Sequence, residues 1–240
     1  MVCNMRVMVV AGGPGVDIQG LRQAVQEANR VLAVDSGAEY LRQIDVIPAE
    51  LWGDMDSIST DTLRWAEDCG VPRVVFPAEK DMTDAELCLR GVDKEAEILF
   101  VSSLTGRPDH VLSNLLLIGR LTDEGYRLTM TDGLTWIFPV KGSVDFRIPE
   151  VLVSESAVVS LLPLFENAEG VYTKGLYYPL HDATLIPGSS FSVSNRVGAK
   201  ARDSETTKNP DGSSSGVCAD EQPGFVIRKG IALVFVTPAV

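Results

Sequence analysis

Aspartates dominate the residues of this sequence that could do chemistry, and the closest pair lies in Trp52-Gly53-Asp54-Met55-Asp56-Ser57. In an extended chain, residues two apart point to the same side, so Asp54 and Asp56 are expected to converge on one point. Carboxylates that close repel each other unless a cation lies between them. Their hard oxygen atoms favour Mg²⁺, especially beside a phosphate substrate. A solvated acidic turn that caps the following helix is the alternative explanation.

A second acidic segment, Lys80-Asp81-Met82-Thr83-Asp84, precedes a helical pattern. Thr83 or Asp81 could cap that helix, whose N-terminus favours anions. Lys80 offers a cation for phosphate, while Asp81 and Asp84 could complete a metal site. Capping alone explains Asp84 well, because acids are expected in the first turn of a helix, but it explains the Lys80-Asp81 pair poorly.

Two more segments combine small residues with charged ones. Val34-Asp35-Ser36-Gly37-Ala38 puts a carboxylate at a strand end before a small turn that a ligand can approach, although an ordinary βα turn explains it equally well. Thr105-Gly106-Arg107-Pro108-Asp109-His110 is followed by Asn114. Arg107 is suited to binding phosphate oxygens through two hydrogen bonds. His110 and Asn114 share a helix face because they are four residues apart, but a lone histidine is more often structural.

The elements that must position these residues alternate between strand and helix over the first 140 residues. Strands are predicted at 5–10, 31–34, 74–76 and 98–102, and helices at 38–43, 58–69, 85–91 and 111–121. This alternation predicts an α/β domain over residues 1–140, with a Rossmann-like, mainly parallel sheet and helices on both faces. All four chemical segments end or follow strands. They are therefore expected to share one crevice at the carboxyl edge of the sheet.

The character of the chain changes after residue 140. β-like runs at 144–148, 157–163, 190–194 and 225–236 are separated by Gly and Pro and predict an all-β sandwich domain over residues 141–240. The segment of about 199–222 is polar and is interpreted as a long flexible loop.

Composition excludes several classes of protein. The formal net charge of −12, with no basic patch, argues against a nucleic-acid partner. No apolar stretch approaches the roughly 18 residues of a membrane span. The four cysteines lack metal-binding spacing and are expected to be reduced thiols of a cytoplasmic protein. Two histidines exclude a His-rich metal site, and no GxSxG, HExxH or Walker A motif is present.

Taken in chain order, the four segments resemble the signature of the thiamine pyrophosphokinase family, which reads A-D-G-G-A, G-D-x-D-S, K-D-x-T-D and G-G-R-x-D-H-x-x-x-N. Two later segments extend the resemblance: residues 175–180 are similar to its G-L-x-W-P-L, and residues 192–195 to its S-x-S-N. Three positions depart from the pattern. Ser36 and Thr105 replace glycines, and Tyr178 replaces a tryptophan but keeps an aromatic ring.

The resemblance implies a Mg²⁺-dependent transfer of diphosphate from ATP to thiamine, by attack of the thiamine hydroxyl on the β-phosphorus. It also implies a homodimer that holds thiamine in a cleft between its subunits. The implied metal ligands are Asp54, Asp56 and Asp84. The implied catalytic residues are Asp54, Asp56, Asp81, Asp84, Arg107 and Asp109, with Asp81 or Asp109 accepting the hydroxyl proton. The implied nucleotide contacts are Asp35, Ser36, Gly37, Lys80, Thr83, Arg107, His110 and Asn114. The implied thiamine contacts are Asp109, Tyr178, Ser192, Ser194 and Asn195.

Two other functions fit part of this pattern. A DxD glycosyltransferase or a nucleotide hydrolase would use the same metal with a different acceptor, and would not need the Tyr178 and Ser194 segments. A module that senses nucleotide or thiamine would bind without catalysis. Loss of a metal-binding aspartate would be its sign in the sequence, but all the aspartates are present.

Overall fold

The computed structural model describes residues 5–77, 81–154, 156–198 and 222–238. The chain divides into two compact units, Met1–Pro139 and Val140–Val240. Lys80 and nearly all of the predicted loop at 199–222 lie outside the described residues. No helix in the described ranges is both long enough and apolar enough to cross a membrane.

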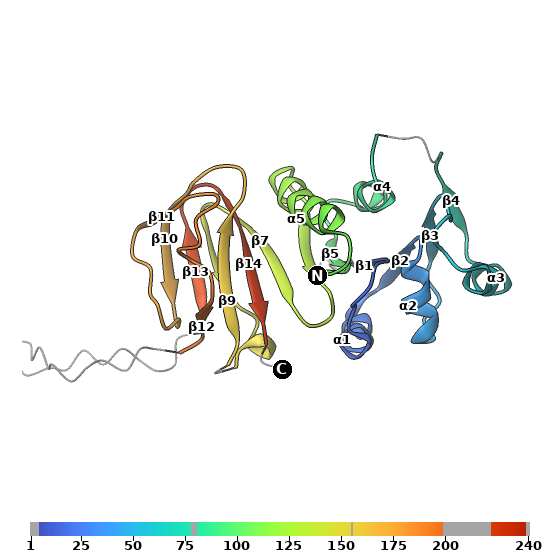
Figure 1. Ribbon diagram of the computed structural model, residues 1–240, viewed down its shortest axis with the longest axis horizontal. Helices are drawn as coiled ribbons and strands as arrows, with labels where there is room; N and C mark the ends of the chain where they lie inside the picture. The colour runs from blue at the N-terminus through green and yellow to red at the C-terminus, as the bar shows by residue number, and fades with distance from the viewer. Residues whose placement is uncertain (1–4, 78–80, 155, 199–221, 239–240) are drawn as a thin grey trace, which may run out of the picture. The chain divides into compact units, whose positions relative to one another are not determined.

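The N-terminal unit is built on a parallel sheet (Figure 1). Its strands lie in the order β6-β5-β1-β2-β3-β4, and every neighbouring pair is parallel. The strands are β1 (Arg6–Ala11), β2 (Arg30–Val34), β3 (Glu50–Gly53), β4 (Arg73–Val75), β5 (Glu97–Val101) and β6 (Arg127–Thr131). β7 (Trp136–Lys141) pairs antiparallel with β6. The sequence-based prediction of a mixed α/β fold with a mainly parallel sheet is confirmed. The strand order reverses between β1 and β5, and in such sheets ligands bind at that switch point.

Helices flank both faces of this sheet. Figure 1 shows α1 (Ile18–Ala24), α2 (Gly37–Gln43) and α3 (Thr60–Asp68) on one face, and α4 (Asp84–Gly91) and α5 (Pro108–Asp123) on the other. A short 3-10 helix, η1 (Val25–Glu27), follows α1. Met8 and Val10 of β1 belong to the hydrophobic cluster that α1, α2 and α3 complete. Because side chains alternate along a strand, Val7 and Val9 point to the opposite face, and they are buried as well. Burial on both faces explains why this strand is a continuous apolar run.

The C-terminal unit consists of antiparallel strands. One group has the order β12-β9-β14, with β9 (Val158–Pro163), β12 (Asn195–Arg196) and β14 (Ile231–Thr237). A separate four-stranded sheet has the order β11-β10-β13-β8, with β8 (Val144–Arg147), β10 (Ala168–Lys174), β11 (Ala183–Leu185) and β13 (Gly224–Ile227). The one helical segment among the described residues of this unit is the 3-10 turn η2 (Glu150–Leu152).

Two details of the predicted β-rich region were wrong. The run 190–194 forms turns and bends rather than a strand, and Ser194 has a φ of 61°. The run 225–236 is divided into β13 and β14 by a turn in which Gly230 has a φ of 92°. A residue with a positive φ cannot continue an extended strand, which accounts for the break at Gly230 and separates the first run from β12 at Ser194.

Candidate active site

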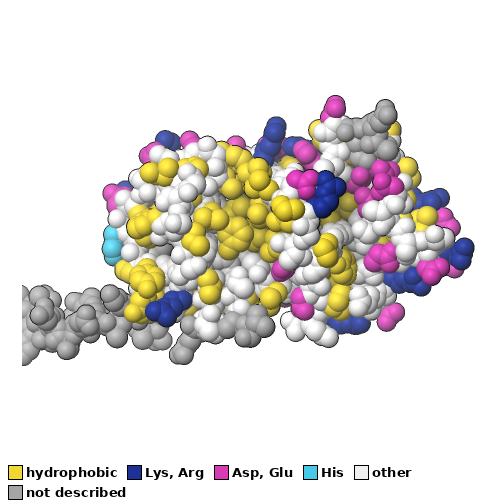
Figure 2. Space-filling view, in the orientation of Figure 1, with side chains coloured by type: hydrophobic (Ala, Val, Ile, Leu, Met, Phe, Trp, Pro, Cys, Tyr) yellow, Lys and Arg dark blue, Asp and Glu magenta, His cyan; other side chains and the backbone are white. Residues whose placement is uncertain are grey.

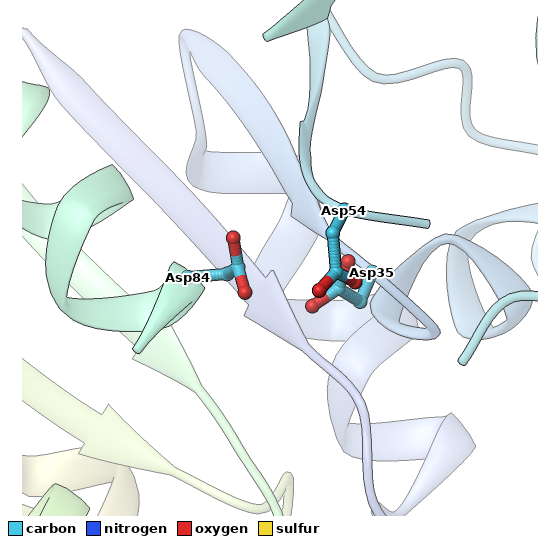
Figure 3. A group of neighbouring side chains, drawn as sticks. All are labelled: Asp35, Asp54 and Asp84. Carbon is cyan, nitrogen blue, oxygen red and sulfur yellow. The ribbon is translucent and has the colours of Figure 1, made fainter. Parts of the chain in front are cut away.

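Three aspartates from three separate elements meet at the carboxyl edge of the parallel sheet (Figure 3). Asp35 follows β2, Asp54 follows β3, and Asp84 begins α4. One carboxylate oxygen of each residue lies within 4.8 Å of the others, and all three residues are partly buried. In Figure 3 the side chain of Asp84 extends toward the adjacent pair Asp35 and Asp54. We call Asp35, Asp54 and Asp84 the acidic cluster.

The turn after β2 directs Asp35 into the acidic cluster. Asp35 has a φ of 43°, and its N–H donates to the carbonyl of Trp52 at 2.9 Å. Its Oδ1 accepts from the N–H of Met55 at 3.3 Å. Gly53 has a φ of 134°, and a Cβ at this position would lie 1.8 Å from Asp35 Oδ1. The carboxylate of Asp35 therefore occupies space that only a glycine leaves open.

The predicted convergence of Asp54 and Asp56 rested on an extended chain, and that premise was wrong. The strand ends at Gly53, and Met55 has a φ of 66°. The left-handed residue between the two aspartates breaks the alternation of side chains. Asp56 is exposed, and its N–H donates to Asp54 Oδ1 at 3.2 Å. In the part of the chain that the structure describes, the acidic cluster thus contains Asp35 where the sequence predicted Asp56 as a ligand.

The start of α4 places Asp84. Thr83 is the N-cap of this helix, and its hydroxyl accepts from the N–H of Glu86 at 3.2 Å. The other end of the helix rests on Trp52, because a Cβ on Gly91 would lie 2.6 Å from the indole. The indole N–H in turn donates to Glu50 at 2.7 Å. Asp81 is exposed and lies outside the acidic cluster.

The electrostatics of the acidic cluster favour a cation. Burial, followed by the negative charge of Asp84 and smaller effects of Asp54 and Asp56, raises the pKa of Asp35 to about 6. The hydrogen bond from Met55 acts in the opposite direction. Among the described residues, every charged group that shifts this pKa is a carboxylate. Three partly buried carboxylates that repel one another, offering only oxygen atoms, fit a hard divalent cation such as Mg²⁺.

The raised pKa predicts how the stability of the metal-free protein depends on pH. Between pH about 4 and about 6 the folded state binds more protons at Asp35 than the unfolded state, so the free energy of unfolding falls as pH rises. We expect an Asp35→Asn variant to lack this fall. In urea unfolding with EDTA, the free energy of unfolding of the variant should exceed that of the wild type. This difference should be small near pH 4, grow up to about pH 6 and then stay constant. A difference in the free energy of unfolding that shrinks as pH rises would contradict the prediction.

Two glycines, Gly12 and Gly37, allow the end of β1 and the turn after it to approach closely the turn after β2. A Cβ on Gly37 would lie 2.0 Å from the carbonyl oxygen of Val10, and a Cβ on Gly12 would lie 1.9 Å from Ser36 Oγ. Ser36 stands at the N-cap of α2, where its side chain makes no capping hydrogen bond. Gly12 thus leaves the space that the Ser36 hydroxyl occupies. Ser36 and Gly37, two of the nucleotide contacts that the resemblance implied, are not members of the acidic cluster.

Sequence reasoning missed how the turn after β1 is held. The hydroxyl of Thr105 donates to the carbonyl of Pro14 at 2.8 Å, and the hydroxyl of Ser103 contacts the same carbonyl. The N–H of Thr105 donates to Ser103 Oγ at 3.0 Å. The hydroxyl of Tyr40 donates to the carbonyl of Gly13. No local pattern signals these bonds, because they join segments about 90 and 27 residues apart.

The predicted phosphate-binding segment lies at the start of α5. Arg107 pairs with Asp109 at 2.6 Å, and both side chains are exposed. The guanidinium of Arg107 lowers the pKa of Asp109 to about 2. His110 is exposed, whereas Asn114 donates to the hydroxyl of buried Ser102 at 3.1 Å. This hydrogen bond joins α5 to the residue that follows β5.

The predicted thiamine contacts of the C-terminal unit gather around β12. Asn195 exchanges hydrogen bonds with the backbone of Tyr178, a residue that is 55% exposed. The N–H of Ser194 donates to Ser160 Oγ at 3.0 Å, and the hydroxyl of Ser192 donates to the carbonyl of Leu161. Figure 2 shows hydrophobic side chains over the C-terminal unit, while acidic side chains gather on the N-terminal unit.

Sequence profiles of known protein families match both units of the chain. The sequence profile described as "Thiamin pyrophosphokinase, catalytic domain" matches residues 21–130, and the profile "Thiamin pyrophosphokinase, vitamin B1 binding domain" matches residues 146–207. Thiamine pyrophosphokinase of Bacillus subtilis is 30% identical over 80% of this chain and 89% of its own length. Thiamine pyrophosphokinase 1 of Arabidopsis thaliana is 27% identical over 62% of this chain and 58% of its own length.

Solved structures show the same fold. The crystal structure of the Bacillus subtilis thiamine pyrophosphokinase superposes with a TM-score of 0.76 at 23% identity, covering 98% of this chain and 100% of the other. The thiamin pyrophosphokinase of Candida albicans superposes with a TM-score of 0.70 at 16% identity, covering 98% of this chain and 90% of the other.

Proposed function

The chain belongs to the thiamine pyrophosphokinase family, whose reaction moves diphosphate from ATP to thiamine, and we propose that its acidic cluster holds the Mg²⁺ for this reaction. Membership makes the chain a kinase-type transferase with ATP and thiamine as substrates. One observation carries the proposal: carboxylate oxygens of Asp35, Asp54 and Asp84 lie within 4.8 Å of one another, inside the matched catalytic span. Such an all-oxygen donor set suits Mg²⁺ that also binds phosphates.

The proposed transfer forms one bond and breaks another. The thiamine hydroxyl oxygen bonds to the β-phosphorus of ATP, the bond from that phosphorus to the oxygen bridging it to the α-phosphate breaks, and AMP leaves. Bound Mg²⁺ would neutralise phosphate oxygens, which is much of what phosphoryl transfer needs. Arg107 is exposed and supplies a planar guanidinium, so it can exchange Asp109 for phosphate oxygens.

The hydroxyl proton needs an acceptor, and Asp81 and Asp109 are the two candidates from the sequence. Asp109 is a weak base while it pairs with Arg107, because its pKa is lowered to about 2. Binding of phosphate by Arg107 would release Asp109 and restore its basicity. Asp81 is exposed and follows the segment 78–80, which is not described. We therefore propose that Asp109 accepts the proton only after Arg107 has released it and bound phosphate.

The finer architecture belongs to the same proposal. We interpret the N-terminal unit as a Rossmann-like ATP- and Mg²⁺-binding domain, and the two antiparallel sheets of the C-terminal unit as a sandwich that binds thiamine. The match of residues 146–207 to a vitamin B1 binding domain supports this division of roles. Homodimerisation and a cytoplasmic location remain predictions from the sequence.

A product assay tests the function. With ATP, Mg²⁺ and thiamine, AMP and thiamine diphosphate should appear in equal amounts by mass spectrometry, and EDTA should reduce the rate at least about a hundredfold. AMP or ADP without thiamine diphosphate would indicate another acceptor or a hydrolase. Nucleotide binding without turnover would indicate a sensing module. Turnover that is unaffected by EDTA would contradict the Mg²⁺ proposal alone.

A further inference from the structure

The side chain of Asn195 is directed to the backbone of the chain. Its Oδ1 accepts from the N–H of Tyr178 at 3.0 Å and from the N–H of Arg196 at 2.9 Å. Its Nδ2 donates to the carbonyl of Tyr178 at 2.7 Å. An amide oxygen has two lone pairs, so both are occupied, and one N–H remains for any other partner. Asn195 thus binds both polar groups of the Tyr178 backbone and has little capacity left for a ligand.

The segments around these two residues are joined at further points. The N–H of Tyr177 donates to the carbonyl of Arg196 at 2.9 Å, and Leu176 forms an antiparallel bridge with Val197. The guanidinium of Arg196 lies 4.1 Å from the centroid of the Tyr177 ring. These contacts fix the chain on both sides of the hydrogen bonds that Asn195 makes.

The ring of Tyr178 contrasts with its backbone. It meets the ring of Tyr177 edge-on, with 4.8 Å between centroids, yet 55% of the residue remains exposed. An exposed aromatic ring on a fixed backbone is preorganised to bind a flat heteroaromatic group, because little conformational freedom is lost on binding.

We propose that Asn195 is a positioning residue that acts on thiamine through the aromatic ring of Tyr178. The inference rests on the proposed function, in which the C-terminal unit binds thiamine. The sequence resemblance implied that Asn195 lies near thiamine, and its hydrogen bonds assign it an indirect role. Asn195 therefore affects thiamine binding only while the ring of Tyr178 is present.

A double-mutant cycle in the full chain tests this dependence. Asn195→Ala and Tyr178→Ala should each raise the KM for thiamine about tenfold, with the KM for ATP and kcat changed less than about twofold. The double variant should resemble Tyr178→Ala alone, within about twofold. A direct contact between Asn195 and thiamine would multiply the two effects to about a hundredfold, and that result would overturn the inference.

Controls separate positioning from folding and from the function itself. Asn167→Ala changes an exposed asparagine of the same unit and should leave kcat, the KM for thiamine and the KM for ATP unchanged. Asn195→Asp keeps the acceptor for the Tyr178 N–H but loses the donor to its carbonyl, so an intermediate KM for thiamine is expected. Hydrogen exchange of the Tyr178 amide should accelerate at least about tenfold in Asn195→Ala, and unchanged exchange would overturn the inference without any assay. A wild-type protein that neither binds nor converts thiamine would overturn the proposed function, and this inference with it.

Discussion

Replacing Asp54 or Asp84 with asparagine is expected to lower kcat at least about a hundredfold and to weaken Mg²⁺ binding, while the protein remains folded. Each substitution removes one negative charge and one ligand oxygen from a group whose oxygens lie within 4.8 Å of one another. The shape of the side chain is nearly unchanged. Loss of a repelling charge should keep the metal-free protein at least as stable as the wild type. Steady-state kinetics, Mg²⁺ titration by calorimetry and thermal melting measure the three quantities.

Two further variants make this test specific. Asp68→Asn removes an exposed carboxylate at the end of α3 that is not a member of the acidic cluster, and it should leave kcat unchanged. Asp56→Asn separates the ligand set of the structure from the set predicted from the sequence. We expect a smaller loss for Asp56→Asn than for Asp54→Asn, because Asp56 is exposed and outside the acidic cluster. Equal losses of kcat in the two variants would indicate that Asp56 is also a metal ligand. Near-normal activity of Asp54→Asn would contradict the assignment of the metal site.

Substituting Gly53 with alanine is expected to lower the free energy of unfolding by about 3 kcal/mol or more and to weaken Mg²⁺ binding at least about tenfold. Two effects combine. A φ of 134° is unfavourable for any residue with a Cβ, and the new Cβ would lie 1.8 Å from Asp35 Oδ1 and 2.5 Å from its Cγ. Relief of the collision requires Asp35 to leave its place in the acidic cluster. Chemical denaturation and calorimetry in the same buffer measure both losses.

Gly70→Ala is the matched control for this prediction. Gly70 also has a positive φ, 72°, but a Cβ there would meet no atom within 4 Å. The control therefore carries backbone strain without a collision and should cost about 1 kcal/mol, or about 2–4 °C in Tm, with Mg²⁺ binding unchanged. If Gly53→Ala matches Gly70→Ala in both stability and Mg²⁺ binding, the close approach of Gly53 to Asp35 does not shape the site.

The parallel sheet and the location of the acidic residues could be predicted from the sequence. The apolar run Val7–Val10 is buried on both faces of the sheet, as continuous hydrophobic strands of this class are. Because the chain alternates strand and helix, the residues after successive strands had to reach one edge of the sheet. Asp35 and Asp54 reach that edge by this rule, although β3 was not among the predicted strands, and Asp84 is placed by the start of α4.

The boundaries and identities within the β-rich region were less predictable. Strand β12 has two residues, and the run before it turns at Ser194, so the β propensity of Phe191 and Val193 gave a false signal. β propensity mainly reflects packing against neighbouring strands, which a single sequence does not display. This short strand is defined by its antiparallel pairing with β9, a neighbour that lies far away in the sequence.

The sequence by itself determined the class of fold, the family, and the edge of the sheet at which the acidic residues gather. Only the tertiary structure decided which aspartates point at one another and what Asn195 binds. The physical reason is the range of the interactions. Hydrophobic periodicity and strand–helix alternation are local, whereas the left-handed residue Met55, the missing Cβ of Gly53 and the contact of Asn195 with Tyr178 depend on dihedral angles and neighbours that the folded chain supplies.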